Sequence, residues 1–217
     1  MLNDCKKPPT EIRYQDDSVS LSIKPLEEKD AEEITKAIRL SMKNLLPFMD
    51  WAHDPITTES QRDRIKKSRE NYSKGEEYEF AIFDRNSCEF LMSACWHVGK
   101  NRNKKSLEIG YWTSAKHSNK GLATLVTKIL TVVGFDFMGS DRIEIGCNKQ
   151  NETSHRIIKK CGFQFEGEIR NYFNSPTLDM IKNGYSTERT YLQYALLPDD
   201  RGQLPWYKKI KELIEVL

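Results

Sequence analysis

The chain has 217 residues, and its 34 Lys and Arg residues nearly balance its 32 Asp and Glu residues, so the formal net charge is only +2. This balance argues against a dedicated nucleic-acid-binding surface, which normally shows as an excess of basic residues. No apolar run approaches the roughly 20 residues of a membrane-spanning helix, and the N-terminus lacks the apolar core of a signal peptide. We therefore expect a soluble, cytoplasmic protein without membrane contact.

The first third of the chain predicts one strand and two helices. Residues 1–18 are polar and contain two adjacent prolines and two adjacent aspartates, which predicts a flexible N-terminal arm. Apolar and polar residues alternate over 19–23, as in a half-buried strand, and then recur at helical spacing from 27 to 44. After an ordered loop over 46–55, a second helix capped by one of two adjacent threonines is predicted to run to residue 72.

The middle of the chain is rich in predicted strands, which occupy 79–84, 90–98 and 107–112. A basic polar loop over 100–105 joins the last two of them. A long helix with a broad apolar stripe follows over 122–137.

The last third begins with a predicted strand over 142–147. A short helix follows, which we expect Asn151 to cap and Gly162 to end, because glycine suits the left-handed position after a helix. Two more strands are predicted over 163–170 and 190–197.

These elements predict a single α/β domain on a mixed sheet over residues 19–197. Apolar residues after position 206 fall on one helical face, so residues 198–217 are expected to form an amphipathic helical extension.

Cysteines and histidines show no pattern of a metal site. The five cysteines are far apart, at positions 5, 88, 95, 147 and 161. They form no CxxC pair, and no histidine lies at metal-ligand spacing from them, so we expect free thiols and no metal. No partner can be identified for any of the four histidines, and none is assigned as a general base.

The segment with the clearest chemistry is the strand, loop and helix between residues 107 and 133. The loop that contains Gly121 leads into a long helix, whose first backbone N–H groups have no partner within the helix. With the positive end of the helix they form an anion site suited to a pyrophosphate, which Gly121 allows to approach closely. The loop matches neither GxxxxGK[ST] nor GxGxxG, which disfavours nucleotide hydrolysis and dinucleotide redox chemistry.

Five short segments occur in a characteristic order. They are LPFMDW at 46–51, EIGYW at 108–112, KGLA at 120–123, NETS at 151–154 and CGFQFEG at 161–167. Together they resemble the GNAT superfamily of acetyl-CoA-dependent N-acetyltransferases, and within it the RimJ/RimL-like branch named for ribosomal-protein N-terminal acetylation. The resemblance implies a central, mixed, mostly antiparallel and twisted sheet with helices on both faces and a splayed strand pair that holds acetyl-CoA.

One segment departs from the family pattern. The cofactor loop of the family usually reads Gln/Arg-Gly-x-Gly-x-Gly/Ala, whereas residues 118–123 read SNKGLA. Ser118 stands where Gln or Arg is usual, and Asn119 replaces the first glycine. Backbone N–H donors do not depend on side-chain identity, and asparagine tolerates positive φ better than most residues.

The resemblance assigns the residues that contact acetyl-CoA. Backbone groups of Trp112 and Thr113 would meet the pantetheine, and Asn151 would contact the cofactor from the start of its helix. The residues that would hold the phosphates are Asn119, Lys120, Gly121, Leu122 and Ala123.

The family chemistry is direct attack of an amine on the thioester, which needs a neutral amine, a stabilised oxyanion and a proton for the departing thiolate. Glu108 is the candidate base, and the alternative is a strand glutamate that faces solvent or pairs with a lysine. Ser154 matches the position that protonates the thiolate, although serine is also common at helix starts. Trp51 belongs to the loop that lines the acceptor groove in this branch.

Three functions remain open. The first is acetylation of a protein N-terminal α-amine, with a ribosomal-protein-like acceptor, and the second is acetylation of a small amine such as an amino acid, amino sugar or toxin. The third is a catalytically weak acyl-CoA-binding or interaction module, motivated by the departure at Ser118 and Asn119. Because the branch often forms homodimers, the terminal helix could cover its own domain or a second subunit.

Overall fold

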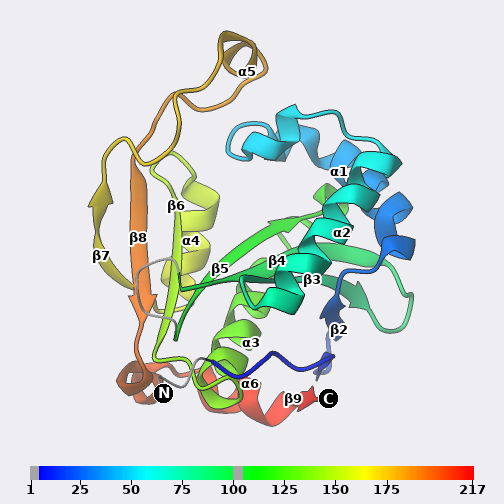
Figure 1. Ribbon diagram of the computed structural model, residues 1–217. Helices are drawn as coiled ribbons and strands as arrows, with labels where there is room; N and C mark the ends of the chain where they lie inside the picture. Colours follow the sequence, from blue (N-terminus) through cyan, green and yellow to red (C-terminus); the bar gives the residue numbers. More distant parts are fainter. Residues whose placement is uncertain (1–4, 100–104) are drawn as a thin grey trace.

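The computed structural model describes residues 5–99 and 105–217 (Figure 1). The first four residues of the predicted arm and most of the predicted basic loop lie outside this part of the chain.

A single nine-stranded sheet organises the described residues, in the order β7-β8-β6-β5-β4-β3-β2-β1-β9. The strands are β1 (Ile12–Gln15), β2 (Ser20–Pro25), β3 (Glu77–Asp84), β4 (Phe90–Val98), β5 (Ser106–Thr113), β6 (Arg142–Asn148), β7 (Gln164–Ile169), β8 (Tyr191–Leu196) and β9 (Ile214–Val216). Within the described chain, β5 and β6 form the one parallel pair, because a helix crosses over between them. The expected mixed, mostly antiparallel α/β sheet is therefore confirmed.

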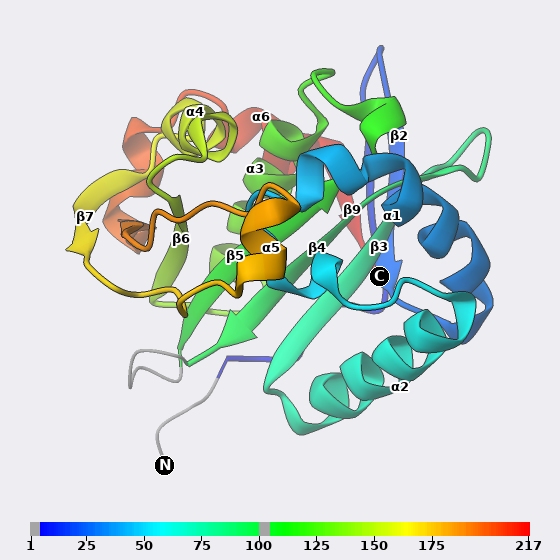
Figure 2. The ribbon, with the colours of Figure 1, turned by 90° about the horizontal axis from the view of Figure 1, so that it is seen from above.

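Helices cover both faces of the sheet (Figure 2). They are α1 (Ala31–Leu45), α2 (Thr58–Lys74), α3 (Leu122–Asp136), α4 (Glu152–Lys160), α5 (Leu178–Lys182) and α6 (Tyr207–Leu213), with single-turn 3-10 helices η1 (Glu28–Asp30), η2 (Asp50–His53), η3 (Ala115–His117) and η4 (Pro198–Gln203). Among these helices, none combines the length and apolar character that a bilayer crossing requires.

The alternation of side chains along the strands divides the core in two. In β3, Phe80 and Ile82 join the larger cluster beneath α3 and α6, whereas Ala81 and Phe83 join the smaller cluster beneath α1 and α2. Side chains two residues apart in a strand lie on the same face, so β3, β4 and β5 contribute to both clusters. Consecutive residues of these strands thus face different helices, except at the register shift opposite Ile82 and Phe83, where Leu91 and Met92 both join the larger cluster.

The prediction of a flexible arm over residues 1–18 is wrong for residues 12–15. Residues 12–15 form β1, which pairs with β2 on one side and with β9 on the other. Ile12 and Tyr14 are buried in the larger cluster, and Arg13 forms an ion pair with Glu215 (Nη1–Oε2 3.5 Å). The strand has the alternating pattern expected of a half-buried strand, but its polar neighbours on both sides hide this signal.

The C-terminal helix is shorter than predicted and packs on its own chain. It ends at Leu213, and β9 follows because residues 214–216 gain backbone hydrogen bonds to β1. The Asp136 carboxylate at the end of α3 accepts a hydrogen bond from the Tyr207 hydroxyl (3.0 Å) and pairs with Lys211 (2.7 Å). Burial of Tyr207 and Ile210 completes the contact with α3.

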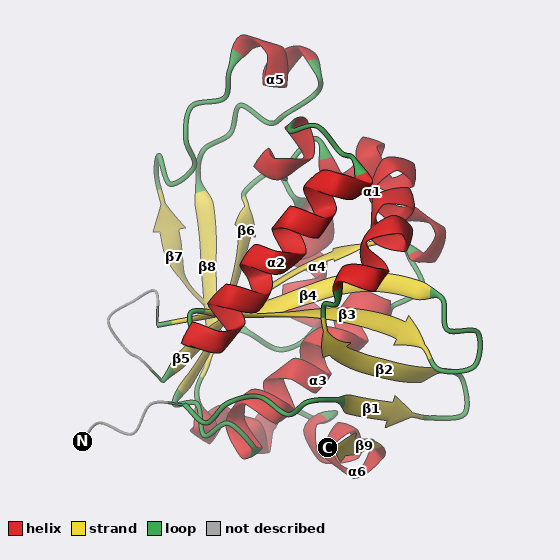
Figure 3. Cartoon of the chain, turned by 45° about the vertical axis from the view of Figure 1, so that its right-hand side comes forward, coloured by secondary structure: helices red, strands yellow, loops and turns green. Residues whose placement is uncertain are grey.

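The segment between β7 and β8 contains α5, which the sequence pattern does not predict. It rises above the end of the sheet (Figure 3) and is held there by the loop after α1. The Tyr185 hydroxyl donates a hydrogen bond to Asp50 Oδ1 (2.6 Å), and the Ser186 N–H donates to the Pro47 carbonyl (2.9 Å). The His53 ring packs edge-on against Tyr185, with centroids 5.3 Å apart.

Candidate active site

The two central strands, β5 and β6, pair only at their first halves. Their register ends at the Ile109–Ile145 pair, although β5 continues to Thr113 and β6 to Asn148. Beyond this point β5 stays bonded to β4, and β6 stays bonded to β8. The facing backbone edges of β5 and β6 are therefore available to a ligand that enters between them. This is the splayed strand pair that the family resemblance implies.

A cavity of about 490 Å³ lies at this opening. Its wall comes from the end of β5, the loop before α3, the first turn of α3, one side of α4, and the end of α1 with the loop that follows it. Eight of the residues expected from the sequence to contact ligand or to act in catalysis line it: Trp112, Thr113, Asn119, Gly121, Leu122, Ala123, Asn151 and Ser154. The fold thus brings together segments that lie more than 100 residues apart in the sequence, from Lys43 to Lys160.

The loop before α3 has the conformation of an anion-binding turn. Gly121 is the N-cap of α3 at φ +78°, and Asn119 is also left-handed at φ +60°. A Cβ on Gly121 would meet no atom within 4 Å, so this residue faces open space. Because the first N–H groups of an α-helix lack intrahelical partners, the start of α3 presents donors to the cavity.

The start of α4 forms the opposite wall. As expected, Asn151 caps this helix, with its Oδ1 accepting a hydrogen bond from the Ser154 N–H (3.1 Å). The cap fixes the first turn of α4, and both residues line the cavity. The loop before α3 and the first turn of α4 therefore face one ligand-sized space from two sides.

The charge of the cavity wall is positive although the net charge of the chain is close to zero. Lys43, Arg156 and Lys160 line the cavity, and no Asp or Glu does so among the described residues. Arg156 also pairs with Glu152 (3.3 Å). An anionic ligand is therefore favoured by side chains as well as by the helix starts.

Tyr111 is a cavity residue that the sequence pattern does not single out, although it lies inside the EIGYW segment. Its hydroxyl is buried, and within the described chain it makes no hydrogen bond of good geometry. Burial raises the pKa of Tyr111, and the neighbouring Ser154 hydroxyl opposes this rise. A buried hydroxyl without a good partner has donor capacity left for a ligand in the cavity.

Glu108 does not line the cavity. It lies in the paired half of β5, opposite His97 on β4 and Glu144 on β6, and accepts a hydrogen bond from the Tyr191 hydroxyl (2.9 Å). Burial and the charge of Glu108 raise the pKa of Tyr191, which keeps that hydroxyl protonated as a donor. Glu108 shares its face of β5 with Gly110 and Trp112, so it lies below the opening between the strands.

Trp51 and Lys120 also lie outside the cavity wall. The Trp51 ring packs against Trp112, with centroids 6.0 Å apart, and Trp112 in turn packs against Phe90 at 5.5 Å. Trp51 thus supports the wall from behind, and Lys120 is exposed at the loop surface.

Comparison with known proteins identifies similar chains and folds. The family profile described as acetyltransferase (GNAT) domain matches residues 20–164. The probable N-acetyltransferase YjcK of Bacillus subtilis (strain 168) is 30% identical over 155 residues, which cover 70% of this chain and 84% of YjcK. YdaF of the same organism, provisionally described as a ribosomal N-acetyltransferase, is 27% identical over 165 residues, which cover 74% of this chain and 88% of YdaF.

A solved structure shows the same fold. Mycobacterium smegmatis RimJ in complex with CoA-disulfide superposes with a TM-score of 0.77, and the match covers 96% of this chain and 98% of RimJ. Its sequence identity is 19%, so the likeness concerns the fold.

The left-handed conformation at Asn119 can be tested by substitution. We expect Asn119→Val to lower the free energy of unfolding by about 1–2 kcal/mol, because a β-branched residue is strained at positive φ. Asn119→Gly is the matched control and is expected to cost less, since glycine adopts this conformation freely. Urea denaturation of the two variants measures the difference, and equal losses would contradict the backbone conformation described for this loop.

Proposed function

This chain belongs to the acetyltransferase (GNAT) domain family and is an N-acetyltransferase, and from that premise we propose that it transfers the acetyl group of acetyl-CoA to the α-amine of a protein N-terminus. The observation that carries the proposal is the cavity where β5 and β6 separate, with two helix starts and basic side chains around it.

Acetyl-CoA fits the groups that surround this cavity. The backbone N–H groups of residues 119–123 would hold the pyrophosphate at the start of α3, and Lys160 and Arg156 add positive charge from α4. Trp112 and Thr113 would offer backbone groups to the pantetheine along the unpaired edge of β5. Asn151 would contribute its amide N–H groups, since its Oδ1 already accepts the cap bond.

The requirements of the reaction favour an α-amine over a lysine side chain. An α-amino group has a pKa near 7.7–8.0, so roughly a tenth or more of it is neutral at pH 7. A lysine with a pKa near 10.4 is neutral only about 0.04% of the time. An N-terminal substrate therefore needs only a modest base, and holding amine and thioester together supplies much of the acceleration.

The reaction needs a base for the amine and a proton donor for the thiolate, and we propose residues for both roles. Glu108 would accept the proton of the amine through an intervening water, because it lies below the opening on the same face of β5 as Gly110. Ser154 would protonate the departing thiolate. The Tyr111 hydroxyl, which is buried in the same wall, is a second candidate for that role.

The acceptor is proposed from two kinds of support. YdaF is provisionally described as a ribosomal N-acetyltransferase, and RimJ shares the fold. The loop between β7 and β8 is bonded through Tyr185 and Asp50 to the loop after α1, which lines the cavity, and we propose that an extended chain end would lie along these two loops. A ribosomal-protein-like N-terminus is therefore the proposed acceptor class.

A peptide panel tests the acceptor. With acetyl-CoA, a peptide that has a free N-terminal Ser or Ala and an internal lysine should gain one acetyl group, located at the N-terminus by mass spectrometry. The matched control is the same peptide with a blocked N-terminus, which should gain none. Turnover of small amines alone would overturn the protein-acceptor proposal.

The role of α4 can be tested with two neighbouring lysines. We expect Lys160→Ala to weaken acetyl-CoA binding by about 0.5–1 kcal/mol, or roughly two- to five-fold in Kd, because this residue lines the cavity. Lys159→Ala removes the same charge from the same helix at an exposed position outside the wall and should have little effect. Calorimetry at low salt measures both, and equal losses would show that only the overall charge of α4 matters.

Glu108 can be tested by its effect on the pH profile. We expect Glu108→Gln to lower kcat/KM most at pH 6–7, where the α-amine is mainly protonated and a base is needed. The loss should shrink above pH 8, where the amine deprotonates unaided. A uniform loss across this range would assign Glu108 a structural role, through its hydrogen bond from Tyr191.

A further inference from the structure

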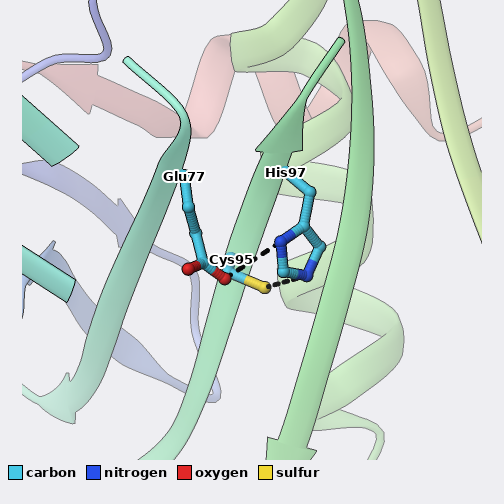
Figure 4. Close-up of side chains that lie close together, drawn as sticks. All are labelled: Glu77, Cys95 and His97. Carbon is cyan, nitrogen blue, oxygen red and sulfur yellow. Dashed lines mark hydrogen bonds and ion pairs between the residues drawn. The ribbon is translucent and has the colours of Figure 1, made fainter. Parts of the chain in front are cut away.

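Three side chains on the face of the sheet that α2 covers form a chain of contacts that the proposed function does not use (Figure 4). His97 Nδ1 lies 2.9 Å from Glu77 Oε1, and His97 Nε2 lies 3.4 Å from Cys95 Sγ. Glu77 belongs to β3, and Cys95 and His97 are two residues apart on the same face of β4. The expectation that no histidine has a suitable partner is therefore wrong for His97.

The order of the contacts determines what each atom can do. The Glu77 carboxylate accepts a hydrogen bond from Nδ1–H, which fixes the neutral ring with its lone pair on Nε2. That lone pair faces Cys95 Sγ and can accept the thiol proton, leaving a thiolate beside an imidazolium. A nucleophile, a base and a group that orients the base are thus aligned, which is the general arrangement of an activated nucleophile.

The charges around His97 favour this proton transfer. His97 lies between Glu77 on β3 and Glu108 on β5 in the register of the sheet, so carboxylates flank it on both sides. The hydrogen bond from His97 lowers the pKa of Glu77, which therefore stays ionised near neutral pH. On α2, the Asn71 amide also donates to Glu77 (3.4 Å), while Arg64 pairs with Glu79 (2.8 Å) one position along on the same face of β3.

The same contacts are less suited to a metal ion, although the three ligand atoms lie within 4.8 Å of one another. Each ring nitrogen of His97 faces a different partner, with Cys95 on one side of the ring and Glu77 on the other. An ion bound at Nε2 beside Cys95 would leave Glu77 hydrogen-bonded to Nδ1, outside its coordination shell.

Gly110 places the thiol of this cluster beside the gap between the strands. It pairs with Cys95 across β4 and β5, and it is the first residue of β5 beyond the last pair with β6. A Cβ at this position would lie 2.9 Å from Cys95 Sγ and 3.6 Å from His97 Nε2. Cys95 Sγ therefore occupies the space that a side chain at Gly110 would need, and the thiol packs against the backbone of β5 at the point where the strands begin to separate.

From this geometry we propose that Cys95, activated by His97 and Glu77, is an acyl-acceptor site that takes an acetyl group from the thioester substrate. The inference rests on the proposed use of acetyl-CoA, which the reaction consumes as a substrate. His97 Nε2 takes the thiol proton, and Cys95 Sγ forms a bond to the carbonyl carbon. The bond from that carbon to the CoA sulfur breaks, and His97 returns the proton to the departing thiolate. One thioester replaces another, so no oxidant or reductant is needed.

Mass spectrometry of the full chain after incubation with acetyl-CoA tests the proposal. We expect one acetyl group on the peptide that contains Cys95, removable by hydroxylamine as a thioester should be. The group should be absent from Cys95→Ser and reduced at least about ten-fold in rate in His97→Gln, because the thiol then lacks its base. Exposed Cys88, on the turn between β3 and β4, is the control thiol in the same sample.

A second measurement needs no CoA substrate and no variant. At pH 7 and limiting iodoacetamide, Cys95 of the unmodified protein should be alkylated roughly ten-fold or more faster than Cys88, since the thiolate is the reactive form.

Binding of acetyl-CoA is followed by calorimetry in parallel. Bound acetyl-CoA and peptide acetylation without acetyl-Cys95 would overturn this inference alone. Absence of acetyl-CoA binding would overturn the proposed function. Alkylation of Cys95 no faster than that of Cys88 would overturn the activated thiol, whatever the result with acetyl-CoA.

Discussion

The separation of β5 and β6 is the constraint on which the rest of the site depends. Each strand keeps its outer partner, so the unpaired inner edges do not leave the strands unsupported. Gly110 and Gly146 are the first residues beyond the last pair. The Tyr191 ring of β8 occupies the space where Gly146 would carry a side chain, and its hydroxyl reaches across β6 to Glu108. One tyrosine thus ties β8 to β5 just below the opening, so the strands are held together where they pair and apart where a ligand can enter.

Much of this arrangement could be predicted from the sequence, because local chemistry determines it. Asn151 caps α4 and Asn119 adopts positive φ, as the side-chain chemistry of asparagine leads one to expect. The pairing of β1 with β9 was out of reach, since it joins residues more than 200 positions apart and each strand is only three or four residues long. The contact between His97 and Glu77 could not be predicted either, because the register of β3 against β4 brings these two residues together.

The near-neutral net charge is compatible with an anion site because the positive charge is local. Lys43, Arg156 and Lys160 come from two separate helical segments and meet only at the cavity. Acidic side chains lie elsewhere on the sheet: Glu77 and Glu108 flank His97 across β3, β4 and β5, while Glu144 on β6 pairs with Arg142. The fold therefore places positive charge at the opening between the strands and negative charge below it. An anionic thioester substrate and a cationic amine would be drawn to different ends of the same site.

The cysteines show how strand alternation decides the chemistry of a side chain. Cys147 and Cys161 lie in the larger core cluster, where burial raises the pKa of Cys147 to about 11 and that of Cys161 to about 12. Both thiols are therefore protonated at neutral pH and act as small apolar groups. Cys95 follows Ala94, which is buried in that cluster, and so points to the opposite, half-exposed face. On that face the neighbours of Cys95 are the His97 imidazole and, on β5, Gly110, instead of apolar side chains. A shift of β4 by one residue would exchange these environments, so the register that buries Trp96 also delivers Cys95 and His97 to the face on which an acceptor would lie.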